Sequence, residues 1–284
     1  MSYADALKER EDNKRGMGAL YLNIGMPTLI ELNTIEENIK LCKDLGLNFI
    51  EINLNLPQYQ VDRLKASELL LLQQKHDIFF TFHLPEDLEI AHFNKMIRDA
   101  HWKTVFEVID IMKRIGSKIM NMHMSKGIHF TLPSKKVFLY EKYNMEYCQT
   151  FKSFAKQVIE RIGQYPIKVA IENTGVYDKQ FITSIMDELL KDDGFALTWD
   201  IGHDYSSGNL DKDYILKNIN KLKHMHLHDA RGQQNHMVLY DGDLDINKYI
   251  DLAYKEEYSV VIETKTIEAL KESICRLRQS GYSF

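Results

Sequence analysis

The chain has 284 residues, of which 44% are hydrophobic and 27% are charged, as in globular proteins with a sizeable core. No Pro/Gly/Ser-rich or low-complexity stretch divides it, so we expect one folded domain. The formal net charge of −5 gives no general attraction to nucleic acid or anionic membranes, and no apolar run approaches the roughly 20 residues that span a bilayer.

The beginning of the chain differs from the rest. Residues 1–17 are rich in charge, without a strand pattern and without the apolar core of a signal peptide, so we expect a charged N-terminal extension. Residues 18–284 are expected to form the folded domain. The three cysteines are widely spaced and odd in number, which argues against a disulfide framework and fits a reducing compartment. We therefore expect a cytoplasmic protein.

Short apolar runs alternate with amphipathic patterns along the folded domain. Eight runs predict β-strands, at residues 19–25, 47–54, 77–84, 117–124, 167–173, 195–201, 222–229 and 258–265. Between them, apolar residues recur every three or four positions over 95–115 and 141–163, which predicts helices. Gly46, Gly116 and Gly163 each precede a strand, where a left-handed cap ends a helix.

This alternation predicts an α/β protein with a single (β/α)8 TIM barrel. The usual length of such a barrel is roughly 250 residues, close to that of this domain. A doubly wound open sheet is the alternative, but it would not gather six strand ends around one point.

Six of the predicted strands end in a histidine or an acid between apolar residues. These six residues are His83, His123, Glu172, Asp200, His226 and Glu263. Because side chains alternate along a strand, the apolar neighbours face one way and the polar residue faces the other. Burying such groups singly would be costly, so we expect a bound metal ion to compensate them.

The last four strand ends are the predicted metal ligands: Glu172, Asp200, His226 and Glu263. Three carboxylates and one imidazole suit Mn²⁺, Mg²⁺, Co²⁺ or Zn²⁺. Alternation alone does not identify the histidine ligand, because His224 and His228 share the face of His226. His203 lies three residues after Asp200. It is a candidate for contacting a metal-binding side chain, for donating a hydrogen bond to a substrate oxygen, or for binding a metal itself.

In the order of its motifs, the chain resembles the xylose isomerase-like TIM-barrel superfamily. These motifs are E-N-T, then W-D-I-G-H-D, then H-L-H-D with a downstream N-H and G-D-L-D, and finally I-E-T. The resemblance covers about residues 18–280 and is greatest to sugar phosphate isomerases and epimerases. It implies the same four metal ligands, with His226 as the histidine. It also implies that Glu172 and Glu263 act as acid and base on a ketose, through an enediolate stabilised by the metal.

The same resemblance places His203 and Arg231 at substrate oxygens. His83 and His123 are expected to bind sugar hydroxyls or, with Glu172, a second ion. We therefore expect a metal-dependent isomerase or epimerase with a small carbohydrate substrate, in a chain compatible with a homo-oligomer. Phe82, Trp199 and Tyr240 lie near strand ends and either line the pocket or pack in the core.

An alternative within the same superfamily is a multi-zinc phosphodiesterase. The apurinic endonucleases of this superfamily have further metal ligands, which four additional histidines of this chain match. These candidate ligands are His83, His123, His203 and His236. However, Gln234 occupies the position of an aspartate ligand, and no Arg/Lys-rich loop that would grip DNA is evident, so nucleic acid is not the expected partner. A third alternative is a barrel that binds a sugar or a metal without catalysis.

Overall fold

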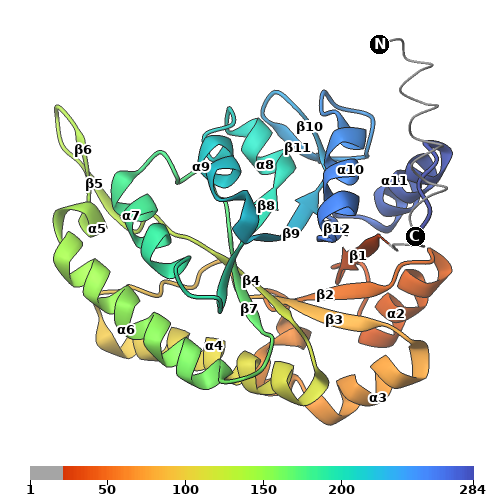
Figure 1. Cartoon of the computed structure of the whole chain (residues 1–284), viewed down its shortest axis with the longest axis horizontal. Helices are drawn as coiled ribbons and strands as arrows, with labels where there is room; N and C mark the ends of the chain where they lie inside the picture. The colour runs from red at the N-terminus through yellow and green to blue at the C-terminus, as the bar shows by residue number, and fades with distance from the viewer. Residues whose placement is uncertain (1–21) are drawn as a thin grey trace.

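The computed structural model describes residues 22–284, and the expected N-terminal extension lies outside them. Eight parallel strands close into a barrel in the order β1-β12-β9-β8-β7-β4-β3-β2, surrounded by helices (Figure 1). The predicted (β/α)8 barrel is therefore confirmed, and the open sheet is excluded.

The barrel strands coincide closely with the predicted runs. They are β1 Asn23–Pro27, β2 Phe49–Asn53, β3 Phe79–His83, β4 Ile119–His123, β7 Lys168–Glu172, β8 Phe195–Asp200, β9 Leu222–Leu227 and β12 Ser259–Ile262. Strand β1 continues two residues beyond the predicted run, of which residues 19–21 are outside the described part of the chain, and β12 ends three residues before the end of its predicted run.

Helices follow the strands and cover the outside of the barrel. They are α2 Ile35–Asp44, α3 Ala66–His76, α4 Lys95–Ile115, α5 Leu139–Lys142, α6 Asn144–Ile162, α7 Gln180–Leu189, α8 Ile201–Ser206, α9 Lys212–Lys217, α10 Ile246–Glu256 and α11 Ile267–Gln279. The predicted helix 95–115 is α4, and the pattern over 141–163 corresponds to α6 with the short α5 before it. Gly46, Gly116 and Gly163 have φ of 62°, 73° and 60°, as expected where L-residues would be strained.

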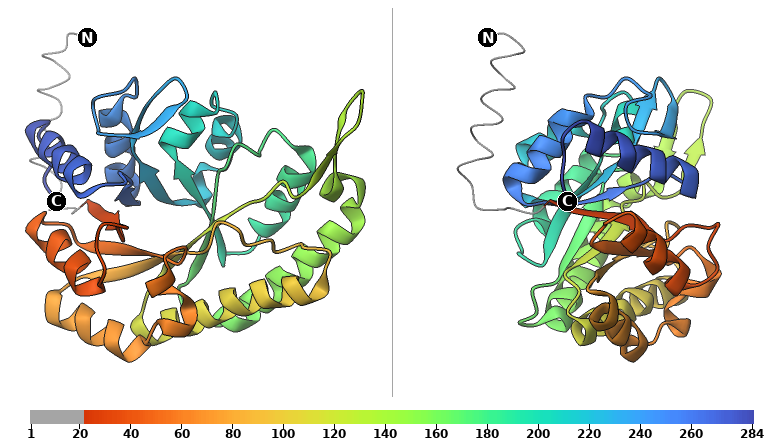
Figure 2. Two further views of the ribbon diagram at one scale, coloured as in Figure 1. Left: turned by 180° about the vertical axis from the view of Figure 1, so that it is seen from behind. Right: turned by 90° about the vertical axis from the view of Figure 1, so that its right-hand side faces the viewer.

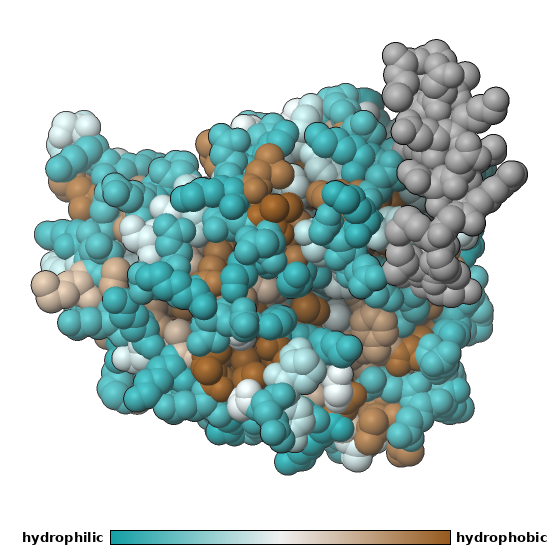
Figure 3. Space-filling model, in the orientation of Figure 1, coloured by the Kyte–Doolittle hydropathy of each residue, from teal (hydrophilic) through white to brown (hydrophobic). Residues whose placement is uncertain are grey.

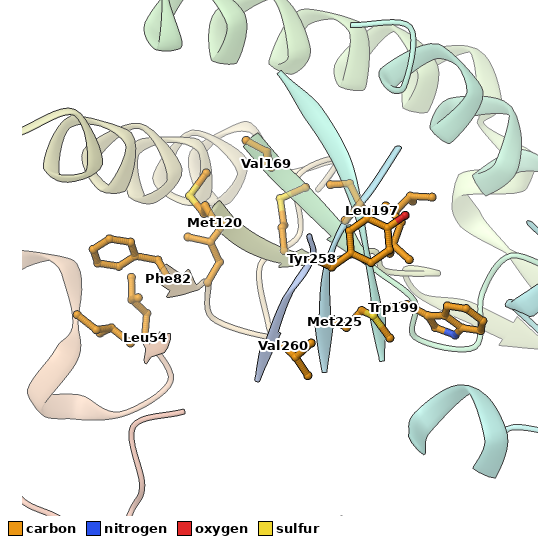
Figure 4. Close-up of a cluster of buried hydrophobic side chains, with 14 of the residues drawn as sticks. Leu54, Phe82, Met120, Val169, Leu197, Trp199, Met225, Tyr258 and Val260 are labelled. Carbon is orange, nitrogen blue, oxygen red and sulfur yellow. The ribbon is translucent and has the colours of Figure 1, made fainter. Parts of the chain in front are cut away.

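The hydrophobic core lies between the strands and the helices. Figure 4 shows apolar side chains from neighbouring strands gathered there, including Phe82, Trp199 and Met225. The Trp199 ring packs edge-on against Tyr249 of α10, with ring centroids 5.5 Å apart, so it faces the helices. Phe82 and Trp199 are therefore core residues, each contributing about 1.5–3 kcal/mol by burial.

Two short hairpins, which the sequence did not predict, follow strands of the barrel. Strands β5 (His129–Thr131) and β6 (Lys136–Phe138) form a hairpin that projects from one end of the molecule (Figure 2). Strands β10 (Asp229–Arg231) and β11 (Gln234–Met237) form the other, which packs against α8. The second hairpin brings His236 to the site described below.

The outer surface is mostly polar. Hydrophilic residues predominate on the face shown in Figure 3, with smaller hydrophobic areas between them. Among residues 22–284, no helix is both long and apolar enough to cross a membrane.

Candidate metal centre

The interior of the barrel is unusually polar. Strand pairing sets His123 beside Glu172 and Asp200 beside His226, so these residues share one level near the carboxyl ends of the strands. The alternate residues, such as Met225 and Leu227, are buried on the opposite face. Alternation in the sequence thus becomes a ring of ionisable groups at the end of the barrel where active sites form.

The four predicted metal ligands converge. His226 Nδ1 lies 3.5 Å from Glu172 Oε1 and 3.2 Å from Glu263 Oε2. Asp200, His226 and Glu263 each offer an atom within 4.8 Å of the others. Among the described residues, both ring nitrogens of His226 and Asp200 Oδ2 are buried and make no hydrogen bond of good geometry. Buried polar atoms without partners, in a set of three carboxylates and an imidazole, fit a divalent cation.

His228 has a different role from His226. Its Nδ1 accepts a hydrogen bond of 2.8 Å from the backbone N–H of His236, and its Nε2 lies 3.1 Å from Asp200 Oδ1. The Nδ1 of His228 is therefore occupied by a backbone donor, whereas the Nδ1 of His226 faces two carboxylates and has no hydrogen-bond partner among the described residues. The ring of His228 also requires Gly202, because a Cβ at that position would lie 2.0 Å from its Cε1.

Two further histidines surround Glu172. The Nε2 atoms of His83 and His123 lie 3.4 and 3.2 Å from Glu172 Oε2, and Asn121 donates a hydrogen bond to the same oxygen. Burial would lower the pKa of His83, but its hydrogen bond to Glu172 and the charge of Glu172 raise that pKa to about 9. Burial alone would raise the pKa of Glu172, yet the charges of His226 and His123 hold it well below its ordinary value. Glu172 is therefore an ionised carboxylate.

His203 and His236 form a second group beside Asp200. Their Nε2 atoms are 3.0 Å apart, and together with His228 they offer three nitrogens within 4.8 Å of one another. His236 Nδ1 lies 3.0 Å from the backbone oxygen of Glu263. Burial, followed by the positive charges of His228 and Lys265, lowers the pKa of His236 to about 4, so this imidazole is neutral near pH 7.

The predicted substrate residue Arg231 lies differently. Its side chain is 60% exposed, with Nε 3.4 Å from Asp243 Oδ1 and a hydrogen bond to the carbonyl of Asp241. Among the described residues we find no contact between Arg231 and the ring of ionisable groups. Gln234, opposite Arg231 in the hairpin, is also exposed.

Three residues near the site were missed by the sequence analysis. Asn121 contacts Glu172, and Lys265 places its Nζ 2.6 Å from Glu263 Oε1. Glu51, which lies deeper in the barrel than the predicted ligands, contacts His224 and His226. Glu51 had a signal that could have been used, because an acid between Ile50 and Ile52 in a predicted strand must face the barrel interior. Asn121 and Lys265 carried no comparable signal.

The matching family model spans residues 39–280 and is that of the xylose isomerase-like TIM barrel, so the chain belongs to that family. One relative is the uncharacterized protein MJ1614 of Methanocaldococcus jannaschii, 26% identical over 209 residues that cover 72% of this chain and 75% of the relative.

Solved structures share the fold at lower identity. A D-tagatose 3-epimerase-like protein superposes with a TM-score of 0.72 at 20% identity, covering 91% of this chain and 96% of that one. The IOLI protein, described with a binding zinc atom, gives a TM-score of 0.69 at 16% identity and covers 93% and 100%. At these identities the likeness concerns the fold.

Proposed function

We propose that this protein is a divalent-metal-dependent isomerase or epimerase of a sugar or sugar phosphate. The observation that carries the proposal is the placement of two ionised glutamates, Glu172 and Glu263, on either side of His226 Nδ1. The names of similar structures support it, since they include a D-tagatose 3-epimerase-like protein and an L-ribulose 3-epimerase. Its three free cysteines fit a cytoplasmic enzyme.

The metal would be held by Glu172, Asp200, His226 and Glu263. When bound, a divalent ion supplies electrostatic stabilisation of the negative charge that develops on substrate oxygens. Mn²⁺, Mg²⁺, Co²⁺ and Zn²⁺ all accept this mixture of oxygen and nitrogen donors.

The two glutamates would carry the proton transfers. Glu172 ends β7 and Glu263 directly follows β12, and these strands are separated in the barrel by β8 and β9, so the two carboxylates reach the centre from different strands. One carboxylate would remove the proton from a carbon next to the carbonyl, and the other would return a proton to the opposite face. His83, with its raised pKa, and His123 would donate hydrogen bonds to substrate hydroxyls, as would His203.

The first test measures metal content and turnover together. We expect about one exchangeable divalent ion per chain in untagged protein, and metal-dependent conversion of at least one compound in a panel that pairs free ketoses with their phosphates. Tight sugar binding without turnover across that panel would instead indicate a non-catalytic binding barrel.

A second candidate is a multi-zinc phosphodiesterase, favoured by one specific observation. A group of three potential ligands, His203, His228 and His236, lies outside the four proposed ligands, and His83 forms another group with two of the four, Glu172 and His226. Two or three firmly held zinc ions and cleavage of abasic-site DNA would favour this candidate. Gln234→Asp then tests the missing ligand, because an added carboxylate would raise the metal stoichiometry only if it reaches the centre.

A further inference from the structure

A buried carboxylate lies beneath the proposed metal ligands. Glu51 of β2 is 1% exposed, and its contacts run across the barrel to β9, which is not a neighbouring strand. Its Oε1 lies 2.9 Å from His226 Nε2, and its Oε2 lies 3.0 Å from His224 Nε2. Thr81 Oγ1 donates a further hydrogen bond of 3.3 Å to Oε2.

These contacts determine which nitrogen of each imidazole carries a proton. A carboxylate can only accept hydrogen bonds when ionised, so a proton on Nε2 suits both histidines: His224 Nε2 is hydrogen-bonded to Oε2, and His226 Nε2 lies 2.9 Å from Oε1. The network continues to Ser259, whose Oγ lies 2.6 Å from His224 Nδ1.

We propose that Glu51 is a positioning residue, which faces Nε2 of His226 and so leaves Nδ1, directed at Glu172 and Glu263, as the atom that binds the metal in exchange for its proton. This inference rests on the proposed metal centre. The imidazole of His226 lies between two sets of carboxylates: Glu51 on the Nε2 side, and Glu172 and Glu263 on the Nδ1 side.

Glu51 acts on His226 both geometrically and electrostatically. The 2.9 Å contact between Oε1 and Nε2 favours one rotation of the ring, and the negative charge makes Nδ1 a stronger donor to a cation. Carboxylate partners of metal-binding histidines usually contribute about 10–100-fold to metal affinity. The interior position of Glu51 strengthens the effect, because water does not screen the interaction there.

The test compares Glu51→Gln and Glu51→Leu with wild type and with Thr198→Val. Thr198 is a matched control, because it is also fully buried and its Oγ1 has no hydrogen-bond partner among the described residues. The affinity of each metal-free protein for Mn²⁺ and Zn²⁺ is measured by competition with a chelating dye, without any substrate. We expect Glu51→Leu to bind about 10–100-fold more weakly. Glu51→Gln should lose less, because its amide oxygen still accepts from Nε2, and Thr198→Val should match wild type.

Unchanged affinity in both Glu51 variants would overturn the inference, as would an equal loss in Thr198→Val. If Glu51→Leu does not fold, the inference is tested by the metal affinity of Glu51→Gln and by the ¹⁵N-histidine NMR spectrum of the zinc-loaded wild-type protein. A proton on Nε2 of His226 supports the inference, and a proton on Nδ1 overturns it. Failure of the wild-type protein to bind metal would overturn the proposed function itself, so the two failures are distinguishable.

Discussion

At the scale of single residues, Glu263 illustrates how a buried carboxylate of the centre is stabilised by neighbours of opposite charge. Its Oε2 lies 3.2 Å from His226 Nδ1, and its Oε1 lies 2.6 Å from Lys265 Nζ. Burial would raise the pKa of this carboxyl group, but the charges of His226 and Lys265 keep it well below its ordinary value. Glu263 therefore stays ionised at neutral pH, as a base must.

Glu263→Gln tests the proposed proton transfer. We expect kcat to fall by roughly 10²–10⁴, because the amide cannot accept the proton in the transition state. Substrate affinity should change much less, since the amide preserves the size of the side chain. Steady-state kinetics and calorimetric binding separate the two effects. The control is Glu268→Gln, an exposed glutamate five residues further on, and an unchanged kcat in Glu263→Gln would refute the two-glutamate mechanism.

Replacement of the two β9 histidines tests the assignment of the ligand. His226→Ala should remove most of the Mn²⁺ or Zn²⁺ affinity, because Nδ1 is the proposed donor atom. His228→Ala should cost less affinity, since that ring orients Asp200 and the backbone of His236. Metal titration of both metal-free variants provides the comparison. A greater loss in His228→Ala would show that the ligand lies two residues further along β9.

At the scale of elements, one buried side chain ties the loop after β7 to the start of α9. The carboxylate of Asp211 accepts hydrogen bonds from the backbone N–H groups of Gly175, Val176 and Tyr177, at 2.6, 3.0 and 2.7 Å. This loop begins directly after Glu172 and Asn173. Asn173 in turn exchanges hydrogen bonds with the backbone of Asp200. The loops thus hold two predicted ligands in a fixed relative position.

Asp211→Ala measures the contribution of this link. The substitution leaves three backbone donors without their acceptor, and each buried unsatisfied group costs about 1–3 kcal/mol. We therefore expect a clear loss of unfolding free energy in denaturant titrations. Asp213→Ala, an exposed aspartate two residues away, should have little effect. Equal stability of the two variants would show that Asp211 does not hold the loop.

At the scale of the whole molecule, the barrel interior concentrates negative charge. Four carboxylates, those of Glu51, Glu172, Asp200 and Glu263, are buried within a few ångströms of shared histidines. A divalent cation would offset their mutual repulsion and connect β7, β8, β9 and β12. Metal binding should therefore stabilise the entire barrel.

Thermal unfolding in the presence and absence of metal tests this expectation. A ligand that binds only the folded state at about 100 times its Kd adds about 2.7 kcal/mol to the unfolding free energy. We expect Mn²⁺ or Zn²⁺ to raise Tm, and EDTA to reverse the increase. His226→Ala should show no such shift. A shift of equal size in that variant would locate the stabilising ion elsewhere.

The elements that the sequence predicted well are those whose pattern is local. Period-two alternation in strands and the three- to four-residue periodicity of α4 are set by backbone geometry, so they can be read without the fold. The hairpins β5–β6 and β10–β11 escaped prediction because their strands are only three or four residues long. Such short segments carry too little periodicity to be recognised.

The sequence by itself determined the barrel and the predicted ligands at the strand ends, because alternation decides which side chains face inward. Only the tertiary structure distinguished His226 from His228, since their difference depends on partners in other strands and in a hairpin. The same holds for Glu51, which meets His224 and His226 across the barrel. The tertiary structure also showed that Arg231 is exposed and paired with Asp243. Such contacts depend on the register and closure of strands far apart in the chain, which no local pattern encodes.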